Sequence, residues 1–165
     1  MMAPVAPLLT LSSLIESKHR LETLRGLTPD RIIDEMLESL GGRKGFGAET
    51  IVQMRRAILA REQEATTGIG NRVAIPHMKG CTHVQQICGA FGRSTHGVNW
   101  SATDGEPVRL FFLILSPPGA EGLHVRAMKK IVHLSRDRKT LDYLIQTPAL
   151  KNLEAIFQEV DAQTT

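Results

Sequence analysis

The sequence has few of the features that mark nucleic-acid-binding and membrane proteins. Aromatic residues make up 4% of its 165 residues, and no run of basic residues is longer than three. The stacking side chains and basic stripe of a nucleic-acid-binding domain are therefore missing, and we expect no nucleic-acid partner. No apolar run is long enough to span a bilayer, and the apolar patch near the N-terminus lacks the basic region that opens a signal peptide. We therefore expect a cytoplasmic protein with no membrane insertion.

Cysteine is also scarce. Cys81 and Cys88 are the only two, and they do not require an oxidising compartment. Together with His83 they could bind zinc, but no second pair of ligands follows at the usual spacing. Cys88 also falls in a predicted strand, where a buried thiol makes a good core residue. The sequence therefore predicts no metal and no cofactor.

The remaining composition is that of an ordinary globular protein. Hydrophobic residues make up 42% of the chain and charged residues 22%, which suits one compact domain with a sizeable core. The formal net charge is +3 and the isoelectric point is about 9.1. A mildly basic chain suits an anionic partner, such as a phosphate or an acidic protein face. Scattered, solvated Lys and Arg residues would give the same net charge without any such partner.

Helical spacing of apolar residues recurs near both ends of the chain. One helix is predicted to begin after Thr28, which can cap it, with Pro29 at its first position. It is predicted to end at Gly41-Gly42. Thr147 and Pro148 predict the start of the last helix in the same way. The predicted helices cover residues 27–42, 48–62, 123–137, 139–146 and 147–160.

Between these helices the pattern changes to short apolar runs broken by Gly and Pro. The runs predict strands over residues 71–77, 85–94, 96–102 and 106–116, of which the last is the most apolar and belongs at the sheet's centre. We therefore expect an α/β fold, a single layered domain over residues 1–165 with residues 1–10 as a lead-in. Its central mixed β-sheet should have about five strands and be flanked by helices on both faces.

The stretch "ATTGIGNRVAIPH", residues 65–77, is a candidate site. Thr66, Thr67 and Gly68 begin a turn whose backbone N–H groups could converge on an anion. Pro76 then ends the predicted strand and pushes His77 outward at the strand end. The alternative is a turn whose histidine is merely exposed.

A second histidine favours the functional interpretation. His124 falls in the first turn of a predicted helix, where the positive potential disfavours imidazolium and attracts phosphate. A histidine held neutral there suits nucleophilic chemistry. Because functional groups gather at strand ends and loops of α/β sheets, His77 and His124 could meet in an active site.

Three stretches together resemble the enzyme IIA domains of the fructose/mannitol type in the bacterial phosphoenolpyruvate:sugar phosphotransferase system. They are "AILAREQEATTGIGNRVAIPH", "DGEPVRLFFLILSPP" and "HVRAMKKIVHLSRD". The resemblance covers roughly residues 10–160, nearly the whole chain. The sequence of residues 66–71 is most similar to that of the nitrogen-regulatory branch of the family, whose members act as phosphorylation-state signals.

The resemblance implies a phosphotransferase component, a histidine phosphocarrier. His77 would accept the phosphoryl group, by analogy on Nε2, from a phosphohistidine of the carrier protein HPr or its nitrogen-branch relative. His124 would hydrogen-bond the phosphoryl oxygens and Arg61 would neutralise them, with support from the turn at Thr66, Thr67 and Gly68. Such transfers depend on positioning and charge neutralisation.

Two departures from the family pattern bear on partner docking. Arg72 stands where a small residue is common, adding positive charge beside the site. Ser101 stands where an acidic residue is frequent, which would alter a loop contact. The alternatives are a sugar-specific component that passes phosphate to a IIB domain, or a protein-binding module of the same fold without phosphotransfer. Regulated target proteins would be further partners.

Overall fold

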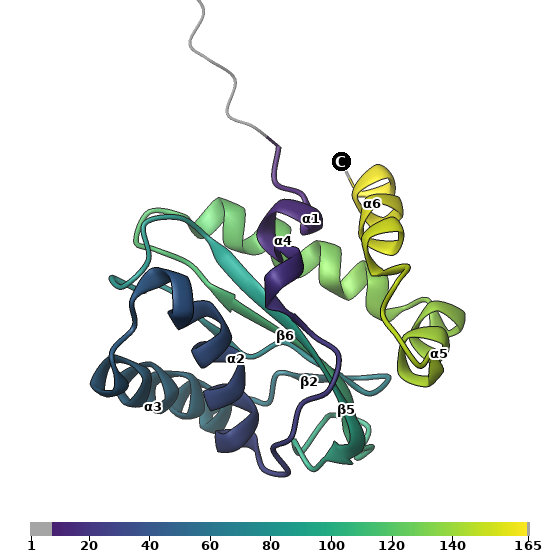
Figure 1. Cartoon of the computed structure of the whole chain (residues 1–165), viewed down its shortest axis with the longest axis horizontal. Coiled ribbons are helices and arrows are strands. Elements are labelled where there is room, and N and C mark those ends of the chain that lie inside the picture. Colours follow the sequence, from purple (N-terminus) through teal and green to yellow (C-terminus); the bar gives the residue numbers. More distant parts are fainter. Residues whose placement is uncertain (1–7, 165) are drawn as a thin grey trace, which may run out of the picture.

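The computed structural model describes residues 8–164, except for the side chains of residues 43 and 44. Figure 1 shows helices packed around a twisted sheet. In chain order the elements are α1 (Leu11–Leu14), the short 3-10 helix η1 (Ser17–His19), β1 (Arg20–Leu21), α2 (Pro29–Lys44), α3 (Ala48–Glu64), β2 (Gly68–Gly70), β3 (Val73–Ala74), β4 (His77–Met78), β5 (Cys88–Val98), β6 (Val108–Leu115), α4 (Glu121–Ser135), α5 (Arg138–Gln146) and α6 (Leu153–Gln163).

The sheet has six strands and mixed directions. Its order is β1-β5-β6-β3-β2, and β4 also pairs with β6. The long central pair β5–β6 is antiparallel, whereas β1 runs parallel to β5, and β3 and β4 run parallel to β6. Both the expected mixed α/β sheet and the central position of the most apolar strand are confirmed.

Alternation along β6 explains why helices cover both faces of the sheet. Phe111, Leu113 and Leu115 join the core cluster formed with α2 and α3. Leu110, Phe112 and Ile114 join the opposite cluster, which α1, α4, α5 and α6 complete. Figure 1 shows the two groups of helices on either side of the sheet. Since both faces of β6 are apolar, neither face can be left to solvent.

Several predicted boundaries are wrong. Residues 85–94 and 96–102 were expected as two strands, but β5 is one strand whose pairing with β6 shifts between Arg93 and Val98. Gly97 lies in that irregular part at φ 78°, a conformation that favours glycine. The first long helix continues past Gly41-Gly42 to Lys44 and is capped by Gly45, which has φ 72°.

The two ends of the chain also differ from expectation. Thr147 caps the C-terminal end of α5 instead of starting the last helix, which begins at Leu153. The segment before α2 holds α1 and β1, and Leu11 donates its N–H to the Asp161 carboxylate of α6. Such short elements carry too little periodicity to be predicted from apolar spacing.

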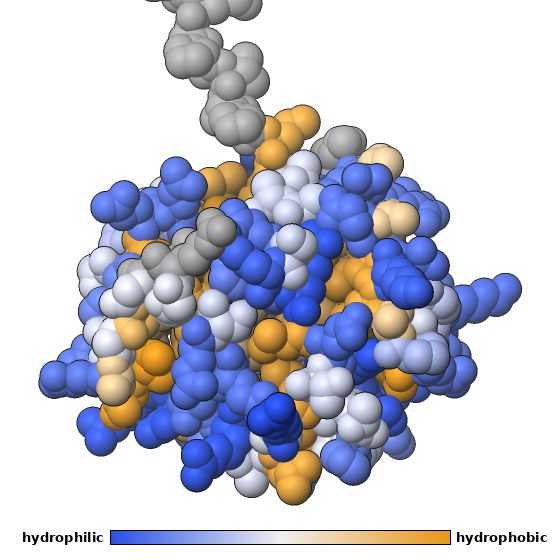
Figure 2. Space-filling view, in the orientation of Figure 1, coloured by the Kyte–Doolittle hydropathy of each residue, from blue (hydrophilic) through white to orange (hydrophobic). Residues whose placement is uncertain are grey.

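On the face drawn in Figure 2, polar side chains cover most of the surface, and apolar ones show in patches between them and at its edges. Among the described residues, no helix combines the length and the apolar character needed to cross a membrane.

Candidate functional site

Pro76 interrupts a strand without ending it. β3 pairs with β6 up to Ala74, opposite Phe111, and β4 resumes the same parallel pairing at His77, opposite Ile114. Pro76 has no N–H to donate, but its carbonyl accepts the Ile114 N–H at 3.1 Å. His77 is consequently buried, with 5% of its surface exposed. The expectation that proline pushes this histidine outward is wrong.

The backbone fixes the protonation of the His77 ring. Its Nδ1 lies 2.8 Å from the Ile75 carbonyl oxygen, which can only accept, so Nδ1 carries the proton. The pKa of His77 is lowered, chiefly by burial and further by the Arg61 and Lys79 cations, against opposing effects of the Ile75 carbonyl and Glu62. The ring is therefore neutral near pH 7, and the lone pair on Nε2 is available to a phosphorus atom.

His124 lies beside His77, on α4. The two ring centroids are 5.1 Å apart and the ring planes are tilted by 60°. Nδ1 of His124 contacts the Ser116 hydroxyl, while its Nε2 is buried without a hydrogen-bond partner among the described residues. When that hydroxyl donates to Nδ1, Nε2 carries a proton that is free to bind an oxyanion.

His124 is neutral for a different reason from the one its sequence position suggested. Its pKa is lowered to about 4, first by burial and then by His77 and Lys79. The backbone N–H of His124 donates to the Ala120 carbonyl at 2.9 Å, so this backbone group is not one of the free donors at the start of the helix. Burial, more than helix polarity, keeps the imidazole uncharged.

The two histidines open into a basic groove of about 630 Å³. Its cationic lining residues come from three places in the fold: Arg61 near the end of α3, Lys79 just after β4, and Lys129 of α4 with Arg136 at the C-cap of that helix. The groove has no Asp or Glu in its lining. Arg61 donates from Nη1 to the Ala65 carbonyl at 2.8 Å, which anchors its guanidinium at this edge.

In the turn at residues 66–68, two backbone N–H groups are already occupied within the chain. The N–H of Thr67 donates to the Glu62 carboxylate at 2.9 Å, and the N–H of Gly68 donates to the Thr66 hydroxyl at 3.0 Å. None of the three turn residues lines the groove. The N–H groups of Thr67 and Gly68 are therefore not free for an external anion.

Packing explains the glycines of this turn. A Cβ on Gly68 would lie 2.8 Å from Cα of Ala102, a backbone atom that cannot yield easily, and Gly70 has φ 96°. The Thr103 N–H also donates to the Gly68 carbonyl at 3.0 Å. Gly68 and Gly70 thus let the loop after β5 pack against β2.

Arg72 lies away from the histidines. Its guanidinium pairs with Asp142 of α5, so the expectation that it adds charge beside the site is wrong. Its φ is 67°, following Asn71 at 54° in the turn between β2 and β3. Ser101 also has a positive φ, 55°, and donates its N–H to Asn99.

Sequence reasoning missed Ser116 and three of the four groove cations. Lys79 follows His77 by two residues. Lys129 lies on α4 and Arg136, the C-cap of that helix, lies seven residues later, which places the two on one face. That spacing was visible in the sequence and could have indicated a basic face beside His124.

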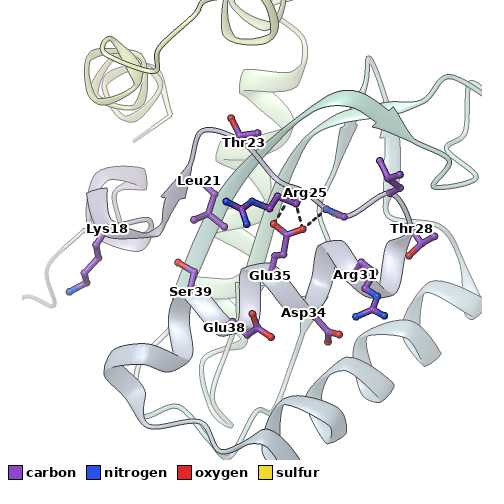
Figure 3. Close-up of a pocket in the computed structure, with 12 residues that line it drawn as sticks. Lys18, Leu21, Thr23, Arg25, Thr28, Arg31, Asp34, Glu35, Glu38 and Ser39 are labelled. Atoms are coloured by element: carbon purple, nitrogen blue, oxygen red, sulfur yellow. Dashed lines mark hydrogen bonds between the residues drawn. The ribbon is translucent and has the colours of Figure 1, made fainter.

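A second cavity, of about 1100 Å³, lies between the segment that follows β1 and α2 (Figure 3). Its lining includes Lys18, Arg25 and Arg31, balanced by Asp34, Glu35 and Glu38. Figure 3 shows the Glu35 carboxylate turned toward the Arg25 backbone, whose N–H it accepts at 2.9 Å. The cavity shares no lining residue with the basic groove.

Both cysteines are buried thiols. Burial raises the pKa of the Cys81 thiol. No set of three or more His, Cys, Asp and Glu side chains within residues 8–164 is placed to hold a metal ion.

A family model described as "Phosphoenolpyruvate-dependent sugar phosphotransferase system, EIIA 2" matches residues 25–160. The chain is 37% identical over 114 residues to a nitrogen regulatory protein of Bradyrhizobium diazoefficiens, covering 67% of this chain and 72% of that protein. It is 34% identical over 122 residues to a fructose-specific EIIABC component of Bacillus subtilis. That match covers 74% of this chain but spans only 17% of the relative's length.

Solved structures agree with the family match. The nitrogen regulatory protein IIA-Ntr of Neisseria meningitidis superposes with a TM-score of 0.79 at 26% identity, covering 89% of this chain and 98% of that one. Enzyme IIA mannitol of Escherichia coli gives a TM-score of 0.71 at 17% identity, covering 87% and 98%, and supports the fold alone.

Proposed function

Because the chain belongs to the EIIA 2 family of the phosphoenolpyruvate-dependent sugar phosphotransferase system, we propose that it is a phosphohistidine carrier with His77 as the acceptor. The observation that carries the proposal is the protonation pattern of His77. Nδ1 holds its proton against the Ile75 carbonyl, and Nε2 is the free nucleophile facing a groove lined by cations.

The transfer follows from this arrangement. A phosphohistidine on the donor approaches, its P–N bond breaks, and a bond forms between phosphorus and Nε2 of His77. The electron pair of the broken bond stays with the donor imidazole, and the Nδ1 proton of His77 stays in place. Since phosphoryl transfer passes through a loose transition state, the protein contributes mainly position and charge.

Two side chains would hold the transferred group. His124 has a buried Nε2 without a partner, and the Ser116 hydroxyl on its Nδ1 would keep the proton on Nε2, where a phosphoryl oxygen could accept it. Arg61 supplies positive charge from the end of α3. The turn formed by Thr66, Thr67 and Gly68 would support the site indirectly. Its hydrogen bonds hold Glu62 and the adjacent loop in place.

The donor that we propose is HPr or its nitrogen-branch relative, and residues 1–165 act as one IIA unit. The nitrogen regulatory relatives favour a signalling role, in which target proteins distinguish phosphorylated from unphosphorylated carrier. The fructose-specific relative favours the second candidate, onward transfer to a IIB domain during sugar uptake.

The test is to incubate the purified chain with phosphoenolpyruvate, enzyme I and HPr or the nitrogen-branch carrier, and to measure intact mass. Wild type should gain one acid-labile phosphate and His77→Ala should gain none. His83→Ala, which removes an exposed histidine, is the matched control and should behave as wild type. A folded wild type that gains no phosphate from either carrier would leave the contact-only module as the better account.

A IIB domain of the fructose type, added after phosphorylation, separates the two candidate roles. The regulatory role predicts that the phosphate stays on the chain over the time in which a sugar-specific IIA would lose it. Rapid and complete transfer to the IIB domain would favour the uptake role instead.

A further inference from the structure

Glu62, in the last turn of α3, is a half-buried carboxylate that is held firmly in place. One of its oxygens accepts the Thr67 N–H at 2.9 Å, and the other accepts the Thr67 hydroxyl. That hydroxyl also accepts a hydrogen bond from Nε1 of Trp100 at 3.4 Å. Both Thr67 and Trp100 are buried. The negative charge of Glu62 is therefore anchored on a buried part of the fold.

A short path of hydrogen bonds links this carboxylate to the ring of His77. The Thr67 carbonyl accepts the Ile75 N–H at 3.0 Å, and the Ile75 carbonyl accepts the Nδ1 proton of His77 across 2.8 Å. Two residues thus separate Glu62 from the Nδ1 edge of the ring. Nε2, the proposed nucleophile, lies on the opposite edge. The carboxylate is therefore linked to the edge of the ring that points away from an incoming phosphoryl group.

Charges of both signs act on the His77 ring. Burial lowers the pKa of His77 most, the groove cations Arg61 and Lys79 lower it further, and the bonded backbone carbonyl and Glu62 raise it. Glu62 does not line the groove. His124, which α4 brings against the ring, is uncharged near pH 7 because burial lowers its pKa to about 4. Glu62 is thus a negative charge that opposes the groove cations at His77.

The proposed transfer changes the charge of this ring. A PO3⁻ unit leaves the donor nitrogen and bonds to Nε2 of His77, while the Nδ1 proton stays in place. The ring therefore changes from neutral to singly positive, and the phosphoryl oxygens carry two negative charges. Arg61 and Lys79 stabilise those oxygens but disfavour the positive ring. A carboxylate linked to the Nδ1 edge has the opposite effect, and it acts more on the ring than on the oxygens beyond it.

We propose that Glu62 is a positioning residue for phosphoryl transfer, which stabilises the positive charge that the His77 ring acquires when phosphorus bonds to Nε2. Through Thr67 its carboxylate also keeps the Ile75 carbonyl in register with Nδ1. The phosphorylated chain is consequently more stable, and it accepts the phosphoryl group more readily from the carrier. This inference rests on the proposed function and adds to it a residue that lies outside the groove.

A purely structural role for Glu62 predicts a different order of variants. Glu62→Gln keeps a hydrogen-bond acceptor for the Thr67 N–H at the same reach but removes the charge. Glu62→Asp keeps the charge but is one methylene shorter, so it reaches Thr67 less well. If Glu62 only holds the turn, Gln is tolerated better than Asp. If its charge acts on His77, Asp is tolerated better than Gln.

The experiment measures how the phosphoryl group is shared at equilibrium between the HPr-type carrier and each folded variant. Intact mass gives the phosphorylated fraction of both proteins. NMR of the same samples, labelled with ¹⁵N in the histidine rings, gives the pH at which phosphorylated His77 loses its Nδ1 proton. Both are measured between about pH 7 and about pH 9. Glu64→Gln is the matched control, since it removes an exposed carboxylate from the same end of α3.

We expect Glu62→Gln to shift the equilibrium toward the carrier by roughly threefold to tenfold at about pH 7. Its phosphorylated His77 should lose the Nδ1 proton at a lower pH than that of wild type does. The shift should shrink as the pH rises, because it disappears once the proton is absent from both proteins. Glu62→Asp should stay within about threefold of wild type, and Glu64→Gln should match it.

Every outcome supports or overturns the inference. If Glu62→Gln shares phosphate as wild type does, or Glu64→Gln shifts the equilibrium equally, the charge of Glu62 does not act on His77 and the proposed function stands. A larger shift for Asp than for Gln would assign Glu62 to the turn alone, which also overturns the inference. If Glu62→Gln does not fold, Glu62→Asp decides, and a shift beyond about threefold overturns it. If wild type accepts no phosphate from either carrier, the proposed function itself fails.

Discussion

The cavity beside α2 and the groove beside α4 are both rimmed by charged side chains, but their charges are arranged in opposite ways. The α2 cavity holds three cations and three carboxylates, and two of the carboxylates are already used: Asp34 pairs with Arg55, and Glu35 accepts backbone N–H groups. The α4 groove holds Arg61, Lys79, Lys129 and Arg136 with no carboxylate in its lining. The α2 cavity therefore mixes charges of both signs, whereas the α4 groove carries positive charge alone and suits an anionic ligand.

The larger of the two cavities is therefore not the one with the features of a functional site. The α2 cavity is larger, about 1100 Å³ against about 630 Å³. The groove, however, contains two buried neutral histidines, one with an unpartnered nitrogen. A buried polar atom without a partner is costly to folding, so its retention points to an external partner.

The largest effect should come from removing a cation from the α4 groove, with the matching change in the α2 cavity as its control. Arg61→Gln removes positive charge beside His77 and should slow phosphoryl transfer about 100-fold, or ~2.7 kcal/mol in transition-state stabilisation. Arg25→Gln removes a cation from the α2 cavity and should leave the rate unchanged. Single-turnover kinetics with a phosphorylated carrier measures the transfer rate of both variants. Equal rates would mean that the groove cation contributes no more to transfer than the cation of the α2 cavity.

The next effect concerns pH. The pKa of His124 is lowered from 6.5 to about 4 by burial, so the unfolded chain binds its proton at a higher pH than the folded chain does. The stability that this group contributes is thus complete above about pH 6.5 and is lost as the pH falls toward about 4, by about 2–3 kcal/mol. Urea unfolding of wild type and His124→Gln across that window should show a steeper decline in wild type.

His133→Gln is the control for this measurement, because it removes an exposed histidine from the same helix. It should decline as steeply as wild type does. Parallel curves for wild type and His124→Gln would mean that His124 is not held neutral by burial.

A smaller effect is expected at the α2 cavity. Glu35→Ala leaves the N–H groups of Arg25 and Gly26 without their carboxylate partner, and should lower the free energy of unfolding by about 2 kcal/mol. Glu38→Ala removes an exposed carboxylate from the same cavity and should change it by less than about 0.5 kcal/mol. Neither variant should alter phosphoryl transfer once folded, and a change in rate would show that this cavity takes part in function.

The smallest effect is predicted for Arg72, a cation that is already paired. Arg72→Gly relieves a non-glycine residue at φ 67°, worth about 1 kcal/mol, but loses the exposed pair with Asp142, worth ~0–1 kcal/mol. Thermal unfolding should therefore show a stability equal to or slightly above wild type, with unchanged transfer. A large loss of stability would mean that the ion pair outweighs the backbone strain.

The fold was predictable where the sequence carries a long, periodic signal. Apolar spacing predicted α2, α3 and α4, and the unbroken apolar run predicted β6 and its central position. The boundaries that failed depend on contacts distant in sequence. β5 continues past Gly97 because β6 pairs with it on both sides of the irregularity, and β1 is held by two residues of pairing with β5.

The site was predictable in its residues but not in its physical details. Motif resemblance indicated His77 and His124, and the structure brings their rings together. The sequence could not show that Pro76 leaves His77 inside the sheet, or that Glu62 and Thr66 occupy the N–H groups of the turn. Those facts depend on which atoms meet in the folded chain, and local spacing does not determine them.

The most direct test of the account is to locate the phosphorus atom. Protein labelled with ¹⁵N in its histidine rings would be phosphorylated by the carrier system and examined by NMR for coupling between phosphorus and each ring nitrogen. The account predicts a single phosphorylated nitrogen, Nε2 of His77, with Nδ1 still protonated against the Ile75 carbonyl. Phosphorus on Nδ1 of His77, or on His124, would contradict it.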